Sequence, residues 1–155
     1  MNENERMAIE WQCARLANNY ANRLDAYDYP GFLELFSDDA ILNMLGREYA
    51  GKAAIAAWLD GREADMVCRH LVTNVTTDVI DERHATGFNY TISYRVRGWR
   101  GREPALFEAP TFLVEYRSVF VRGSSGWLFA RRGVSAALAG EEQMRLLRPD
   151  ANGGS

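Results

Sequence analysis

The feature that most constrains this sequence is the order of its segments, because the helix-like ones come first and the strand-like ones follow. Over residues 5–27, apolar side chains recur every three or four positions, as they do on one face of a helix. Residues 67–81 and 84–99 are instead rich in β-branched and aromatic residues. Helices followed by long antiparallel strands predict an α+β fold, in which the helices cover one face of a curved sheet.

The shorter elements are separated by glycine, proline and polar residues, which favour turns. Three N-terminal helices packed on one sheet leave a cone-shaped space between the two layers, where apolar pockets are common. We expect the two further helices at residues 31–36 and 51–61, and three further strands at 40–45, 111–122 and 127–138.

Composition excludes several classes of protein. The 155 residues carry a net charge of −3 and are 47% hydrophobic, so the chain can bury a core but has no basic field for nucleic acid or an anionic membrane. No apolar run reaches the ~18 residues that a membrane span needs, and the charged N-terminus lacks a secretory signal. The only two cysteines, Cys13 and Cys68, suit a reducing compartment, so we expect a cytoplasmic protein.

Three segments resemble the nuclear-transport-factor-2-like superfamily. They are YANRLDAYDYPGFLELFSDDAIL at 20–42, EYAGKAAIAAWL at 48–59 and VEYRSVFVRGSSGWLFARRGV at 114–134. The resemblance implies a cone-shaped α+β barrel built as a single domain over residues 1–140, with a C-terminal tail over 141–155. It also implies a homodimer or homotrimer, because open-faced sheets of this type usually pair in the superfamily.

Within that superfamily, the strand CRHLVTN resembles scytalone dehydratase and its SnoaL-like relatives. These proteins carry a histidine at the position of His70 and an aspartate at the position of Asp25. The resemblance implies that His70 is a general acid/base and that Asp25 orients its imidazole. Tyr20 and Tyr49 are then expected to polarise the substrate by hydrogen bonding.

Asn89 stands where scytalone dehydratase has a second histidine in its next strand. Alternation places Asn89 opposite Phe88, so only one of these two side chains faces the cone. Neighbouring arginines on the last strand also face opposite sides, so at most one of them reaches the pocket. The residues expected to bind substrate are Asn89, Trp58, Phe112, Phe129 and Arg131.

Cys68 and His70 are two positions apart and could form half of a metal site, but no further ligands stand at a suitable spacing, so we expect no metal. No cofactor is needed either, because a substrate carbonyl already acidifies the neighbouring C–H bond. The resulting hypothesis is a cofactor-independent lyase or isomerase with a small hydrophobic substrate that is cyclic or polyketide-like.

Other interpretations stay open at this point. His70 shares one face of its strand with Cys68 and could be a core histidine. Asp25 lies to the side of the apolar stripe of its helix. The chain could then be a non-catalytic binding protein, or an assembly subunit like those of ring-hydroxylating dioxygenases, which its last hairpin also resembles. Ketosteroid isomerase chemistry is disfavoured, because no carboxylate lies between Ala40 and Leu45.

Overall fold

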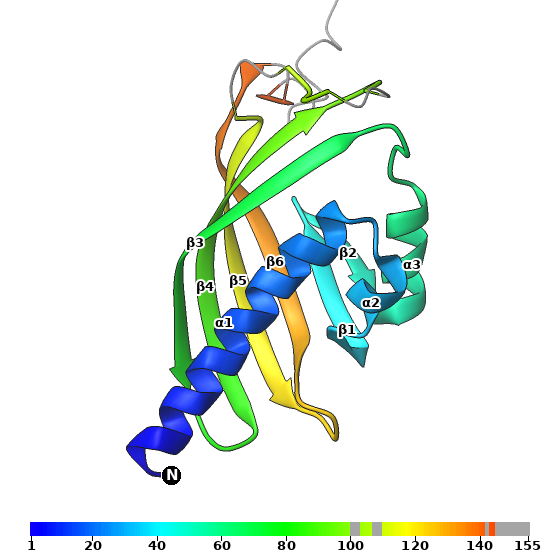
Figure 1. Ribbon diagram of the computed structural model, residues 1–155. Helices are drawn as coiled ribbons and strands as arrows, with labels where there is room; N and C mark the ends of the chain where they lie inside the picture. The colour runs from blue at the N-terminus through cyan, green and yellow to red at the C-terminus, as the bar shows by residue number, and fades with distance from the viewer. Residues whose placement is uncertain (100–102, 107–109, 142, 145–155) are drawn as a thin grey trace, which may run out of the picture.

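The computed structural model describes residues 1–99, 103–106, 110–141 and 143–144 of the chain (Figure 1). Its elements form the expected α+β fold, with helices packed on a six-stranded sheet. In chain order they are α1 (Glu3–Asp25), α2 (Tyr29–Leu33), β1 (Phe36–Met44), β2 (Arg47–Ala50), α3 (Gly51–Asp60), β3 (Val67–Val79), β4 (His84–Val96), β5 (Phe112–Arg122) and β6 (Trp127–Ala139).

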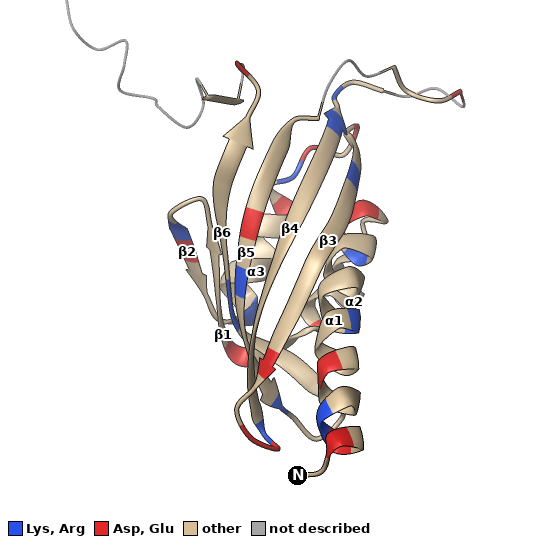
Figure 2. Ribbon diagram, turned by 90° about the vertical axis from the view of Figure 1, so that its left-hand side faces the viewer, with Lys and Arg blue, Asp and Glu red and all other residues tan. Residues whose placement is uncertain are grey.

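The sheet has the strand order β2-β1-β6-β5-β4-β3 and is antiparallel except for the parallel pair β1–β6. All three helices lie on one side of it, with α1 against β3 and α3 beside β1 (Figures 1 and 2). We call this helix-covered side the inner face and the opposite side the outer face. The expectation of a curved, mainly antiparallel sheet is confirmed.

Helix α1 begins at a capping box, in which the Asn2 side chain accepts from the Glu5 backbone and the Glu5 side chain accepts from the Asn2 backbone. Its buried side chains repeat every three or four residues and lie against the sheet. The helix ends at Asp25, two residues earlier than expected, because Tyr27 adopts a left-handed φ of 57°. Asp25 is therefore a helix-terminal residue next to β3.

Helix α2 and strand β1 also differ from the sequence expectations. Helix α2 covers Tyr29–Leu33 because Asp28 caps it and Pro30 stands in its first turn. Strand β1 starts at Phe36, four residues before the predicted strand, since Phe36 already pairs with Phe129 of β6. A register shift between Phe36 and Ile41 accommodates the polar residues in between.

Strand β4 has an unusual distribution of side chains between its two faces. Asn89, Thr91 and Ser93 are buried on the inner face, whereas Phe88 and Tyr90 are partly exposed on the outer face. The apolar stripe of β4 thus faces away from the helices, and the polar stripe faces the interior. Of the two alternatives for this strand, Asn89 is the residue that points inward.

The tail expected over residues 141–155 lies outside the described residues except for 141, 143 and 144. No helix in the described part of the chain is both long and apolar enough to cross a membrane.

Candidate active site

The carboxylate of Asp25 contacts His70 at two points. His70 Nδ1 lies 2.6 Å from Asp25 Oδ1, and the backbone N–H of His70 donates to Asp25 Oδ2 at 2.7 Å. The His70 side chain is 5% exposed and that of Asp25 is 13% exposed. The end of α1 and the first part of β3 are thereby joined through one buried pair, as the sequence resemblance implied for these two residues.

Helical periodicity alone does not direct Asp25 toward the sheet, but the end of the helix does. Helix α1 stops at Asp25, and Tyr27 turns the chain with a left-handed φ. The Asp25 side chain therefore lies at the end of the helix, beside its apolar stripe, and reaches β3. His70 stands on the inner face of β3, where α1 packs most closely. Both residues therefore reach the same side of the sheet.

Two opposing effects act on the pKa of His70. Burial lowers the pKa, while the hydrogen bond to Asp25 and the contact with Cys68 raise it; the balance is a raised pKa. A carboxylate only accepts, so Nδ1 carries the proton that the pair shares. This fixes the tautomer and leaves Nε2 as the basic nitrogen of the neutral ring.

Cys68 lies beside the His70 ring, with its sulfur 3.6 Å from Nδ1 and 3.7 Å from Nε2. One ligand atom from each of Asp25, Cys68 and His70 lies within 4.8 Å of the others, and zinc uses this set of donors. The separation of 2.6 Å between Nδ1 and Oδ1 is a hydrogen-bond distance. It is shorter than the roughly 3.3 Å between two ligand atoms of a tetrahedral zinc ion.

Ser93 is a site residue that the sequence analysis did not identify. It pairs with His70 across β3 and β4, and with Phe112 across β4 and β5, so the three form one row on the inner face. Ser93 is 2% exposed, and its buried Oγ has no hydrogen-bond partner among the described residues. The signal in the sequence was the polar face of its strand. Phe112 contributes a buried apolar side chain to this row.

A buried cation lies deeper in the interior. Arg132 is fully buried, and its guanidinium carbon stands 4.4 Å from the Tyr20 ring, 4.0 Å from the Tyr116 ring and 4.7 Å from the Phe129 ring. Burial lowers the pKa of Arg132. Stacking on three aromatic faces compensates part of the desolvation of the guanidinium. Tyr20 and Phe129 thus belong to a packed cluster around this guanidinium, which we call the Arg132 cluster.

Asn89 is also part of the Arg132 cluster. Its Oδ1 accepts from Arg132 Nη2 at 3.3 Å, and its Nδ2 donates to Thr91 Oγ1 at 3.0 Å. Ser118 Oγ accepts from Arg132 Nη1 at 2.7 Å. The amide of Asn89, expected to bind substrate, is therefore occupied by protein partners on both sides.

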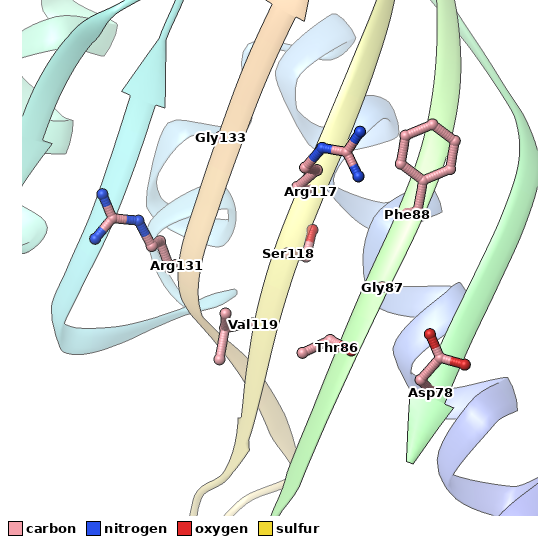
Figure 3. A pocket seen from close by; sticks show the side chains of 9 residues that line it. All are labelled: Asp78, Thr86, Gly87, Phe88, Arg117, Ser118, Val119, Arg131 and Gly133. Carbon is pink, nitrogen blue, oxygen red and sulfur yellow. The ribbon is translucent and has the colours of Figure 1, made fainter. Parts of the chain in front are cut away.

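Arg131 does not lie on the inner face, contrary to the prediction that it lines the pocket. It points outward and pairs with Glu48 at 2.5 Å, beside a shallow hollow of about 360 Å³ that Phe88 and Arg117 also line (Figure 3). The reason is a β-bulge. Phe120 pairs with Phe129 while Val119 pairs with Arg131, so one extra residue on β6 reverses the alternation after Phe129. Arg132, not Arg131, consequently shares the face of Phe129.

Tyr49 and Trp58 come from β2 and α3 and lie next to each other, with ring centroids 6.1 Å apart. Together with Arg62 they line a hollow of about 440 Å³. A second hollow, of about 470 Å³, is lined by Asp25, Cys68 and neighbouring residues. One hollow therefore reaches Asp25 of the buried pair, and the other reaches two of the aromatic residues that were expected to contact substrate.

A family model for a SnoaL-like domain matches residues 5–133. The chain belongs to the SnoaL-like family. This SnoaL-like family includes polyketide cyclases and dehydratases. No curated protein matches the chain.

Solved structures support the assignment of the SnoaL-like protein to the nuclear-transport-factor-2-like superfamily. A provisionally assigned scytalone dehydratase of Novosphingobium aromaticivorans aligns with a TM-score of 0.79 at 15% identity, over 90% of this chain and 91% of the other. A nuclear-transport-factor-2-like protein with a cystatin-like fold from the same organism gives 0.67 at 26% identity, over 88% and 86%. ActVI-ORFA of Streptomyces coelicolor gives 0.67 at 19% identity, over 81% and 95%.

Proposed function

We propose that this SnoaL-like protein is a cofactor-independent lyase or isomerase in which His70 and Asp25 act as a general acid/base pair. The observation that carries the proposal is the buried carboxylate that binds both Nδ1 and the backbone N–H of His70. It fixes the ring, raises its pKa and leaves Nε2 as the nitrogen that exchanges protons.

The reaction begins with removal of a proton next to a carbonyl group. Nε2 of neutral His70 takes this proton, and the C–H electron pair moves onto the carbonyl oxygen, which becomes an enolate. The hydroxyl of Ser93 is buried and unpartnered in the described part of the chain, so it can donate to this developing oxyanion. Tyr20 keeps its proton because burial raises its pKa, and its hydroxyl already donates to the Met44 sulfur at 3.8 Å.

The second half of the reaction returns the proton. The imidazolium of His70 gives it to a β-hydroxyl group, the enolate electrons form a C=C bond, and water leaves. In an isomerisation, the same proton returns to a different carbon. Neither route needs an oxidant, a reductant or a metal, and Asp25 stabilises the imidazolium in both. The family membership supports a cyclic or polyketide-like substrate.

Exchange of α-protons for deuterium tests the shared first step without knowledge of the leaving group. We expect the protein to accelerate exchange of 2-tetralone, a cyclic ketone, in D2O as followed by NMR. His70→Ala should lower the rate about 10²–10⁴-fold. His84→Ala is the matched control, since His84 is half exposed and pairs with Asp81 away from the site. No acceleration by the wild-type protein, or equal rates in the two variants, would contradict the proposal.

A further inference from the structure

Arg62 is a half-buried arginine that the proposed chemistry does not use. It follows α3 in the chain, and its guanidinium carbon lies 5.7 Å from the centre of the Tyr27 ring and 6.0 Å from that of Trp58. Two aromatic rings therefore hold the planar group in one orientation. It also lines the hollow next to Tyr49 and Trp58.

One edge of this guanidinium has no partner. Nε and Nη2 of Arg62 are buried and make no hydrogen bond with any described residue. These two nitrogens carry the parallel N–H donors of one fork of arginine, which matches the two oxygens of a carboxylate. Leaving charged donors buried and unpaired costs more free energy than leaving neutral donors unpaired. A fork kept in this state indicates a ligand.

The neighbours of Arg62 connect it with the Asp25–His70 site. Tyr27 follows Asp25 by two residues, and its hydroxyl contacts the backbone carbonyls of Glu63 and Met66. Tyr27 also lines the hollow that reaches Asp25 and Cys68. Next to the Tyr27 ring, at 5.8 Å, lies that of Tyr29, whose buried hydroxyl likewise has no partner among the described residues.

The charges in the interior also favour binding of an anion next to Arg62. The chain as a whole has a net charge of −3, yet among the described residues the only charged side chain in the buried class is that of Arg132, a cation. Asp25 contributes a negative charge, but His70 already binds its carboxylate. An anion that enters next to Arg62 meets two guanidinium nitrogens that have no hydrogen-bond partner among the described residues, in a partly desolvated site.

We infer that Arg62 binds a carboxylate group of the substrate, so that the SnoaL-like protein acts on a cyclic carboxylic acid. The carboxylate accepts from Nε and Nη2 of Arg62, and the ring of the substrate lies toward Trp58 and Tyr49. The inference rests on the proposed function for the site in which the substrate reacts. It adds the chemical class of the substrate and a specificity-determining residue.

Binding of 2-naphthoate and of the uncharged, similarly shaped 2-naphthamide, measured by calorimetry on the full chain, tests this inference. We expect wild-type protein to prefer naphthoate and Arg62→Gln to weaken naphthoate binding about 10–100-fold, with naphthamide little changed. Arg62→Lys should lose most of the naphthoate affinity too, because lysine keeps the charge but not the fork. Arg83→Gln, in the exposed β3–β4 turn, is the matched control and should bind like wild type.

Three results would overturn the inference: no detectable naphthoate binding to wild type, equal affinities for the acid and the amide, or Arg62→Gln and Arg62→Lys both binding naphthoate like wild type. Circular dichroism of each variant identifies a folding defect, and the milder lysine variant keeps the test valid if glutamine unfolds the protein. Failure of tetralone exchange with arginine-dependent binding intact would remove only the proposed function. Exchange without any preference for naphthoate would remove only this inference.

Discussion

The two carboxylate oxygens of Asp25 contact the ring and the backbone of His70, Oδ1 at 2.6 Å from Nδ1 and Oδ2 at 2.7 Å from the backbone nitrogen. One oxygen sets the tautomer of the imidazole, and the other satisfies a backbone N–H of the edge strand β3. The same carboxylate therefore links the position of the strand to the orientation of the ring. Loss of either contact should change both the free energy of unfolding and the rate of proton transfer. These two quantities can be measured separately.

Asp25→Asn tests the role of the carboxylate. An amide can accept one hydrogen bond through its oxygen, but its NH2 group cannot accept the other, and the negative charge is lost. We expect tetralone exchange to fall about 10²–10⁴-fold and the free energy of unfolding to fall by about 1–3 kcal/mol. Asp39→Asn, at an exposed position of β1, should change neither quantity. An Asp25→Asn variant with wild-type exchange would show that the charge is dispensable.

The raised pKa of His70 predicts how stability depends on pH. A group whose pKa is higher in the folded state stabilises the fold fully below its unfolded pKa, which is close to the ordinary 6.5. This contribution is lost as the pH rises through the higher folded pKa. Urea denaturation from about pH 6 to about pH 9 should therefore show that the stability of wild type decreases relative to His70→Gln. A difference that stays constant or grows with pH would be inconsistent with a raised pKa.

The adjacent arginines Arg131 and Arg132 give a matched pair for testing the bulge. Arg132→Lys replaces a stacked, fully buried guanidinium with a strongly hydrated ammonium, so we expect a loss of about 2–4 kcal/mol in the free energy of unfolding. Arg131→Lys affects only an exposed ion pair with Glu48 and should change stability by less than about 0.5 kcal/mol. Chemical denaturation of both variants measures this difference in stability. Equal effects would contradict the assignment of Arg132 to the inner face and Arg131 to the outer face.

The outer face of the sheet predicts self-association. An apolar row crosses the outer face of the sheet, where neighbouring strands pair at Leu71, Ile92, Leu113 and Leu138. Leu71 is 50% and Leu138 66% exposed. A second copy of the chain would cover this row, as expected for a homodimer or homotrimer.

Light scattering should accordingly give a mass above that of one chain, and Leu138→Arg should lower it toward the monomer. Leu106→Arg is the control, because Leu106 is 94% exposed and lies outside the sheet. A monomeric wild-type protein would leave the apolar row without this explanation. A mass that is insensitive to Leu138→Arg would move the interface elsewhere.

The order of helices and strands determined the fold class, because periodicities of 3.6 and 2 follow directly from backbone geometry. The pairing of Asp25 with His70 was predicted through a family resemblance, since helical periodicity places Asp25 beside the apolar stripe. Its reach to β3 depends on where α1 ends, and that depends on the left-handed turn at Tyr27. Boundaries of this kind are set by local caps and by packing, which periodicity describes only coarsely.

Which face of each strand points inward is set by packing in the folded chain. On β4 the apolar stripe predicts two distinct faces, but only packing against the helices shows that Ser93 and Asn89 are the buried ones. On β6 a single extra residue reverses the alternation, so Arg132 enters the core in place of Arg131. Alternation along a strand shows which side chains share a face. Which of the two faces is buried depends on other elements, and these contact the strand only in the folded chain.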